Sequence, residues 1–202
     1  DFINNASASL IGIVFNMRLM SLIGSDGVVA YGIVMYVNYI ATGIFMGYSV
    51  GIAPVFGYHL GAENHEEIQS LLKKSLRILS VCAVCLTLLI KLSAGGLASI
   101  FVCYSEELMT LTTSAIRLYS WSFLFCWFNV FIAAMFVALN DGPVSSTLSF
   151  TRTLSFQLGS ILLLPARAGA ESMWRAITAA EFLASILSYV MLRRNRAKYK
   201  YY

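Results

Sequence analysis

The chain carries six apolar runs, and each is long enough to cross a membrane as a helix. The hydrocarbon core of a bilayer is about 30 Å thick, which a helix crosses in about 20 residues. A helix also satisfies its backbone hydrogen bonds within the segment, as a lipid-embedded chain must. The pattern predicts an all-α integral membrane protein, a six-transmembrane-helix bundle. The runs cover approximately residues 6–23, 28–60, 75–92, 108–139, 144–164 and 173–192, with Gly95 and Gly96 ending the third and a short apolar piece following at 97–102.

The overall composition excludes several classes of protein. Residues are 58% hydrophobic and only 12% charged, whereas a soluble domain has about 25% charged residues. The net charge of +4 does not indicate nucleic-acid binding, because the basic residues cluster between and after the apolar runs. The sequence has no phosphate loop, dinucleotide fingerprint or nucleophile elbow, so it does not predict an enzyme.

The positions of the basic residues predict how the chain lies in the membrane. With six crossings, the basic group between the second and third runs, Arg152 and the C-terminal tail all fall on one side. Basic residues favour the cytoplasmic side, so we expect a cell (inner) membrane protein with a cytoplasmic C-terminus. Residues 1–192 would form the membrane lobe, and residues 193–202 a basic tail that contacts anionic lipid. Because the chain starts at Asp1, we expect its natural N-terminus to lie upstream.

Residues 41–64 contain a glycine ladder followed by a proline. Gly43, Gly47 and Gly51 recur every four residues and share one helix face, which lets another backbone come close. Pro54 removes a backbone donor and is expected to bend the helix. One interpretation is a glycine-packed membrane helix with a kink. The other is a hinge or an unwound segment beside a substrate path, formed by Gly47, Gly51 and Pro54, since interrupted helices mark such places in transporters.

Charged residues within the spans are candidates for function because burial in lipid is costly. Glu181 is the only carboxylate deep in a predicted span, and its alternative role is to pair or cap helices. Arg152 lies on a polar face of the fifth span that is expected to face the bundle interior or a wet cavity, unless it serves only interhelical hydrogen bonding. That face comprises Ser145, Ser149, Arg152, Thr153, Gln157 and Ser160, with Leu148, Leu154 and Leu158 expected to face lipid.

Amide and aromatic side chains supply further candidates for the substrate and ion pathway. Asn5, Asn38 and Asn129 could bind a ligand or cation through their amides, although amides in membrane helices also hold helices together. Trp121 belongs to an aromatic group in the fourth span that suits flat cationic compounds, although such rings more often form the core. No metal site is predicted, because His59, Glu63, His65 and Glu66 match no ligand pattern. Cys82 and Cys85 lie mid-helix as inert thiols.

Several stretches resemble the multidrug and toxic compound extrusion (MATE) transporters. The most specific is Pro54-Val-Phe-Gly57 leading into Gly61-Ala62-Glu63-Asn64 and then Leu71-Leu72-Lys73-Lys74, which is similar to a family hallmark with a basic amphipathic loop. Phe15-Asn16 with Arg18-Leu19 looks like the end of the family's seventh helix, and residues 29–33 look like the start of the eighth. Trp174, Ala176 and Ala180-Glu181 resemble the twelfth.

The resemblance implies that the spans are helices seven to twelve, the C-terminal lobe of a twelve-helix, two-lobe exporter. It implies alternating access against an N-terminal lobe absent from this sequence, with organic, often cationic, compounds exported in exchange for Na⁺ or H⁺. No other cofactor is expected. Asn5 stands where many members carry a glutamate, so proton coupling through this lobe is in doubt. Two alternatives stay open: a lipid-linked oligosaccharide flippase of the same superfamily, and a non-transporting membrane scaffold.

Overall fold

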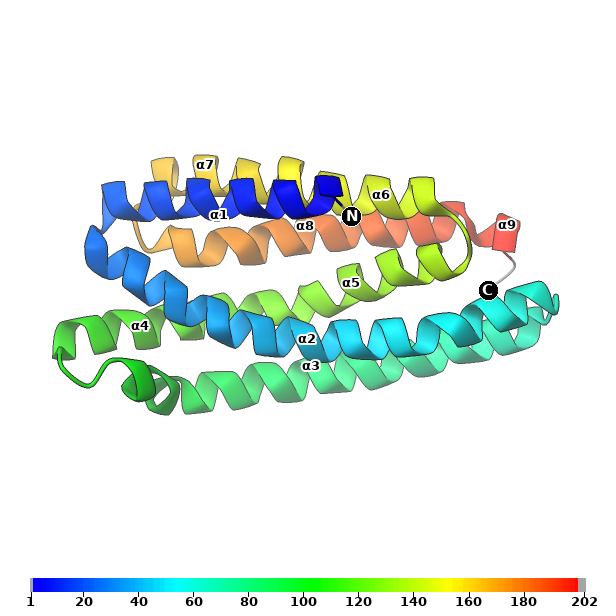
Figure 1. The fold of residues 1–202 in the computed structure, drawn as a ribbon, viewed down its shortest axis with the longest axis horizontal. Coiled ribbons are helices and arrows are strands. Elements are labelled where there is room, and N and C mark those ends of the chain that lie inside the picture. Colours follow the sequence, from blue (N-terminus) through cyan, green and yellow to red (C-terminus); the bar gives the residue numbers. More distant parts are fainter. Residues whose placement is uncertain (1, 200–202) are drawn as a thin grey trace.

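The computed structural model describes the backbone of residues 2–199 and the side chains of 7–166, 169–196, 198 and 199. Figure 1 shows an elongated bundle whose helices run close to its long axis. The helices are α1 Phe2–Leu22, α2 Ser25–Gly61, α3 His65–Phe101, α4 Glu106–Tyr119, α5 Phe123–Ala138, α6 Gly142–Phe150, α7 Leu158–Ala168, α8 Ser172–Arg194 and α9 Arg196–Tyr199.

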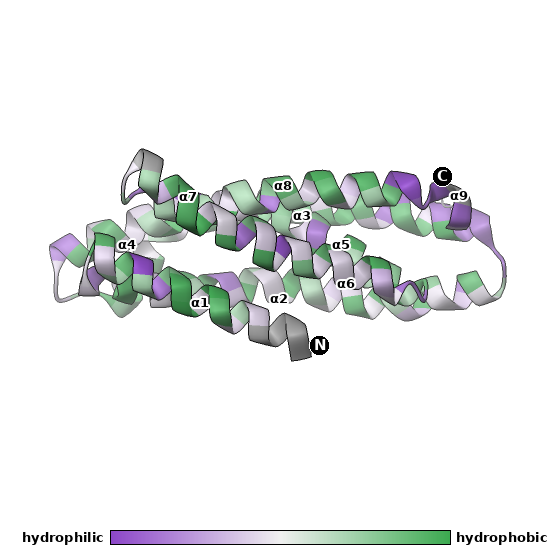
Figure 2. Cartoon of the chain, turned by 90° about the horizontal axis from the view of Figure 1, so that it is seen from above, coloured by the Kyte–Doolittle hydropathy of each residue, from purple (hydrophilic) through white to green (hydrophobic). Residues whose placement is uncertain are grey.

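The predicted six-span, all-helical architecture is confirmed. α4 and α5 form one crossing through a 3-10 turn at Ser120–Ser122, and α6 and α7 form another through a π-helical turn at Thr151–Gln157. Within the described residues, four helices are long and apolar enough to cross a membrane: α2, α3, the combined α4–α5 and α8. Hydrophobic residues cover much of the length of the bundle, whereas hydrophilic residues gather at its ends (Figure 2).

The third span differs from its prediction at both ends. α3 runs without a break from His65 to Phe101, so Gly95 and Gly96 do not end it. Glycine costs roughly 1 kcal/mol relative to alanine in a helix interior, a cost that the buried Ala94 and Ala98 on either side offset by packing into the bundle. The basic residues Lys73 and Lys74 lie on this helix rather than in a loop.

The connection between α2 and α3 is a tight turn built by the hallmark residues. Glu63 takes a left-handed conformation with φ 53°. The side chain of Asn64 accepts a hydrogen bond from the Glu67 backbone N–H at 3.2 Å. This bond satisfies one of the free donors at the start of α3, which explains the asparagine at the end of the motif.

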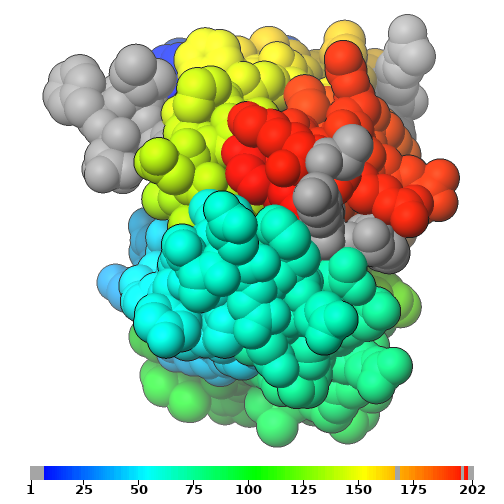
Figure 3. All heavy atoms as spheres, turned by 90° about the vertical axis from the view of Figure 1, so that its right-hand side faces the viewer, coloured from blue at the N-terminus to red at the C-terminus, as the bar shows by residue number. Residues whose placement is uncertain are grey.

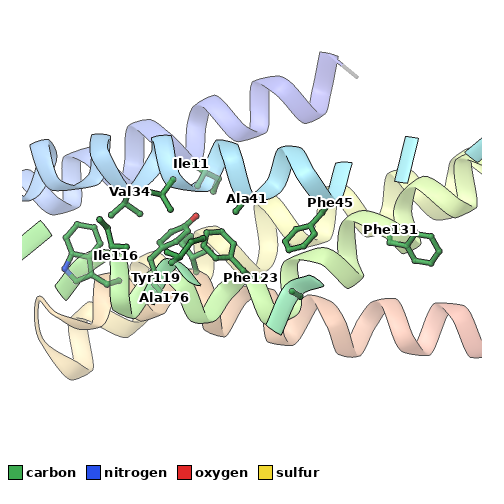
Figure 4. Packing of buried hydrophobic residues seen from close by; sticks show 14 of the residues in the cluster. Ile11, Val34, Ala41, Phe45, Ile116, Tyr119, Phe123, Phe131 and Ala176 are labelled. Atoms are coloured by element: carbon green, nitrogen blue, oxygen red, sulfur yellow. The ribbon is translucent and has the colours of Figure 1, made fainter. Parts of the chain in front are cut away.

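Aromatic residues from three spans pack together in the core of the bundle. The rings of Phe15 and Tyr31 stack with centroids 4.3 Å apart, and Trp174 packs on Phe15 at 6.3 Å. These are residues of α1, α2 and α8 within the stretches that carry the family resemblance. In Figure 4, Tyr119 and Phe123 point into the same interior. Leu148 is also buried, so the prediction that it faces lipid is wrong.

The glycine ladder does not pack within this lobe. A Cβ added at Gly43, Gly47 or Gly51 would meet nothing within 4 Å. α2 is also a continuous helix through Pro54, so the segment is not unwound in this structure. The glycine face is open, and any backbone that approaches it must come from outside the described chain.

The C-terminal segment folds back onto the α5–α6 turn. The Asp141 carboxylate accepts a hydrogen bond from Lys198 Nζ at 2.7 Å and another from the Tyr199 hydroxyl at 2.7 Å. The Tyr199 ring is buried and packs on Phe136, with centroids 6.5 Å apart. In Figure 3 the red C-terminal residues lie against the yellow-green α5–α6 turn. The start of the predicted basic tail is therefore a docked segment in this structure.

We expect Asp141→Asn to speed tryptic cleavage at Arg194 and Arg196. The hydrogen bonds from Lys198 and Tyr199 lower the pKa of Asp141 below its ordinary value. Stability from a depressed carboxyl pKa is present above the unfolded pKa, about 3.9, and is lost as pH falls through the folded pKa. The ratio of the cleavage rate of Asp141→Asn to that of wild type should thus be constant from pH 5 to 8. The control is Asp26→Asn, which alters an exposed carboxylate that forms no ion pair with any described side chain. Equal cleavage in wild type and Asp141→Asn would show that this contact does not hold the tail.

Candidate functional site

Glu181 lies at the centre of the polar cluster inside the bundle. The residue is 1% exposed. Arg152 Nε donates to both carboxylate oxygens, at 2.9 and 3.0 Å. Asn129 Nδ2 donates to Oε2 at 2.8 Å, and Gln157 Nε2 donates to Oε1 at 3.0 Å. Both oxygens of this buried carboxylate are therefore fully engaged as acceptors.

The π-helical turn explains how Arg152 and Gln157 reach the same carboxylate. Five positions apart in an α-helix, two side chains point about 140° away from each other, because each residue turns the helix by about 100°. In a π-helix the hydrogen bond joins residues five apart, which stacks such positions one turn above another. The wide turn Thr151–Gln157 therefore brings both donors onto the face of α8.

The cluster continues from Glu181 into α5 and further along α8. Ser188 Oγ donates to Asn129 Oδ1 at 2.9 Å, and Asn129 Nδ2 also reaches the Glu181 backbone carbonyl at 3.0 Å. Arg152 Nη2 contacts Cys126 Sγ at 3.4 Å. A cavity of about 10 Å³ adjoins Asn129, Arg152 and Ser188, close to the smallest volume that holds one water molecule. The cluster ties α5, the π-helical turn and α8 together.

The charges in this cluster cancel. Arg152 Nη2 lies 2.9 Å from Glu181 Oε1, and the side chain of Arg152 is 23% exposed while that of Glu181 is 2% exposed. A buried charge is tolerated when it is paired and hydrogen-bonded. The guanidinium thus shields the carboxylate from the accessible side, and the site presents no net charge to a ligand.

The structure brings together four of the predicted pathway residues: Asn129, Arg152, Gln157 and Glu181. Asn38 is half-buried on α2 and Trp121 is exposed in the 3-10 turn, and the side chain of neither hydrogen-bonds to Glu181. The Asn5 side chain lies outside the described residues. In the part of the chain with described side chains, no group of three or more His, Cys, Asp or Glu residues is placed to hold a metal ion.

Sequence reasoning missed two members of the polar cluster, Ser188 and Cys126, and one charge outside it, Lys91. Ser188 and Cys126 gave no distinct signal, because isolated small polar residues are common in membrane helices. Lys91 did carry a signal in the sequence, because it is a charged residue within an apolar run. It lies over the Trp121 ring, with Nζ 3.6 Å from the centroid.

The fold and the site define a bundle of membrane-spanning helices in which an ion pair joins a π-helical turn to α8. The MatE family model matches residues 2–160 of the chain. The chain belongs to the MatE family.

Solved transporter structures share this fold. An inward-facing multidrug resistance MATE transporter of the MOP superfamily matches at 20% identity and TM-score 0.89, over 98% of this chain and 46% of that one. An outward-facing structure of such a transporter matches at 20% identity and TM-score 0.90, over 98% of this chain and 45% of that one. A MOP superfamily transporter from Pyrococcus furiosus, described with a reversed polarity of its binding pocket, matches at 21% identity and TM-score 0.90, over 98% of this chain and 45% of that one. The chain thus spans less than half the length of each. None of the curated proteins compared with the chain matches it.

Proposed function

We propose that this chain is the C-terminal lobe of a secondary active exporter that works by alternating access with an N-terminal lobe. The observation that carries the proposal is the near-equal fit of this lobe to transporters recorded in two states, with TM-scores of 0.89 for the inward-facing and 0.90 for the outward-facing structure. A lobe that fits both states equally is suited to move as a unit. Rocking of two such units about a central site is the usual mechanism of transporters built from repeats.

The proposed substrates are organic, cationic small molecules. A flippase for a lipid-linked pyrophosphate needs uncompensated positive charge in its cavity. Arg152 does not supply it, because Glu181 neutralises it at 2.9 Å. The scaffold alternative gives no reason for the fit of this lobe to transporter structures in both the inward-facing and the outward-facing state. These two arguments favour the exporter.

The proposed driving force is inward flow of Na⁺ or H⁺ through a site outside this cluster. A coupling carboxylate must exchange a proton or bind a cation during each cycle. Glu181 already accepts hydrogen bonds from Arg152, Asn129 and Gln157. We therefore assign Glu181 to positioning α5 and α8, and place the coupling acid in the other lobe.

Transport by the full-length protein in proteoliposomes tests this proposal. A fluorescent lipophilic cation serves as substrate, under an imposed Na⁺ or pH gradient. We expect gradient-driven movement of the dye that stops when the gradient is collapsed. Movement that is independent of both gradients would contradict secondary active export. Residues 1–202 alone should support no coupled flux, because a single lobe has nothing to rock against.

The proposed location is the cell (inner) membrane, with the α2–α3 turn and the C-terminus in the cytoplasm. Both lie at the same end of the bundle in Figure 1. In a background without native cysteines, Glu63→Cys and Arg194→Cys should resist a membrane-impermeant thiol reagent in intact cells and react in lysed cells. Labelling of either site from outside would reverse the orientation.

A further inference from the structure

We propose that the groove between the α4–α5 crossing and α8 is a binding site for an anionic phospholipid. The groove has a volume of about 490 Å³. Its residues come from the end of α4, the 3-10 turn, the start of α5, α7 and the first half of α8. The proposal is independent of the transport mechanism.

The walls of the groove suit an acyl chain. Its lining is mostly apolar and aromatic: Leu118, Trp121, Phe125, Leu164, Ala179 and Phe182. Phe125 and Phe182 meet edge to face at 5.3 Å and form one side. Trp121 and Phe182 are 46% and 50% exposed, so the groove opens to the surface of the lobe. The small side chain of Ala179 leaves room between the rings.

Two cations flank this apolar groove. Arg175 lines it directly. Lys91 approaches from α3, with Nζ 3.6 Å from the centroid of the Trp121 ring. Within the described side chains, neither cation takes part in an ion pair. A charge within a membrane span is costly unless it finds a partner, and the Trp121 ring offers Lys91 only a quadrupole.

Nearby carboxylates do not satisfy these cations. A larger adjoining pocket of about 820 Å³, which Arg117 and Arg175 also border, is lined by the carboxylates Asp26, Glu106, Glu107 and Glu171. None of them lies within the 4.0 Å of an ion pair with Arg175. A phosphate group between Lys91 and Arg175, with its acyl chain in the groove, would complement both the charge and the apolar lining. An anionic headgroup fits better than a zwitterionic one, because the zwitterion carries its own cation.

Native mass spectrometry of the full-length protein tests the proposal, with phosphatidylglycerol and phosphatidylcholine titrated in detergent. Each surface cation contributes about fivefold to the affinity for anionic lipid. The most tightly bound molecule of phosphatidylglycerol should therefore have an affinity roughly 25-fold higher than that of phosphatidylcholine. The double variant Lys91→Gln/Arg175→Gln should lose this preference. The control Lys73→Gln/Lys74→Gln removes two exposed charges from α3, away from the groove, and should keep it.

A second variant keeps the test decisive if the charge variant folds poorly. Ala179→Phe fills the groove and leaves both cations in place. It should therefore also abolish binding of the most tightly held phosphatidylglycerol molecule. Equal binding of the two lipids by wild type would overturn the proposal. So would retained phosphatidylglycerol preference in a folded Lys91→Gln/Arg175→Gln or Ala179→Phe variant, which would assign the groove to another occupant.

Discussion

Glu181→Gln is expected to lower the free energy of unfolding of the full-length protein by about 3 kcal/mol. The change leaves the Arg152 guanidinium without an anion at a position where its side chain is only 23% exposed. Breaking a buried pair by removing one partner costs about 3–5 kcal/mol, and partial exposure of Arg152 places this case at the lower end. The change is measured by heating the protein in detergent and monitoring the loss of monodisperse protein as it unfolds.

The double variant Arg152→Gln/Glu181→Gln separates a pairing role from a titrating one. It removes both charges and keeps groups that can hydrogen-bond, so it should recover most of the stability that the single change loses. A coupling energy of this kind is what a double-mutant cycle measures between contacting groups. If Glu181→Gln unfolds like wild type but fails to export, the pairing role is wrong.

Gly51→Leu is expected to reduce export by at least tenfold without weakening the lobe. A side chain at this position meets nothing within 4 Å of its Cβ in the described chain. Replacement of an exposed helix glycine improves helix propensity by up to about 1 kcal/mol, so stability should stay equal or rise. Export should fall because bulk on the open glycine face blocks approach of the other lobe, through overlap worth roughly 1–3 kcal/mol. Dye export and thermal unfolding are measured on the same preparation.

Gly57→Leu is the matched control on the same helix. Its Cβ would lie 3.5 Å from the Ala138 backbone oxygen, in ordinary contact with α5. The atoms of a leucine beyond Cβ are therefore expected to crowd the end of α5 and lower stability. Opposite patterns are thus expected: Gly51→Leu affects export alone, and Gly57→Leu affects folding. Normal export by a well-expressed Gly51→Leu protein would remove the open glycine face from the mechanism.

The sequence predicted the fold well because lipid leaves few choices to a chain. Long apolar runs must be helices, and the connections at Gly24, residues 62–64 and Gly169 fall where polar or glycine-containing turns interrupt them. The end of the third span was mispredicted because local propensity suggested a break at Gly95 and Gly96, whereas packing continues the helix to Phe101.

The site was only partly predictable for a geometric reason. The sequence placed Arg152 and Gln157 on one broad polar face by α-helical spacing. Their convergence on a single carboxylate depends on a π-helical turn, which no periodicity in the sequence indicates. Glycine spacing likewise predicted close packing on α2 but could not say that no part of the described chain packs against these glycines.

We propose that the Arg152–Glu181 pair holds the helices of this lobe together and that ion coupling takes place in the other lobe. The most direct test is export by the double variant Arg152→Gln/Glu181→Gln under an imposed pH or Na⁺ gradient. The measurement uses full-length protein whose folding matches wild type, with dye movement followed in proteoliposomes. We predict that the same ion gradient drives export in the variant and in wild type. Loss of gradient-driven export with normal folding and normal dye binding would contradict the account and make the Arg152–Glu181 pair the coupling site.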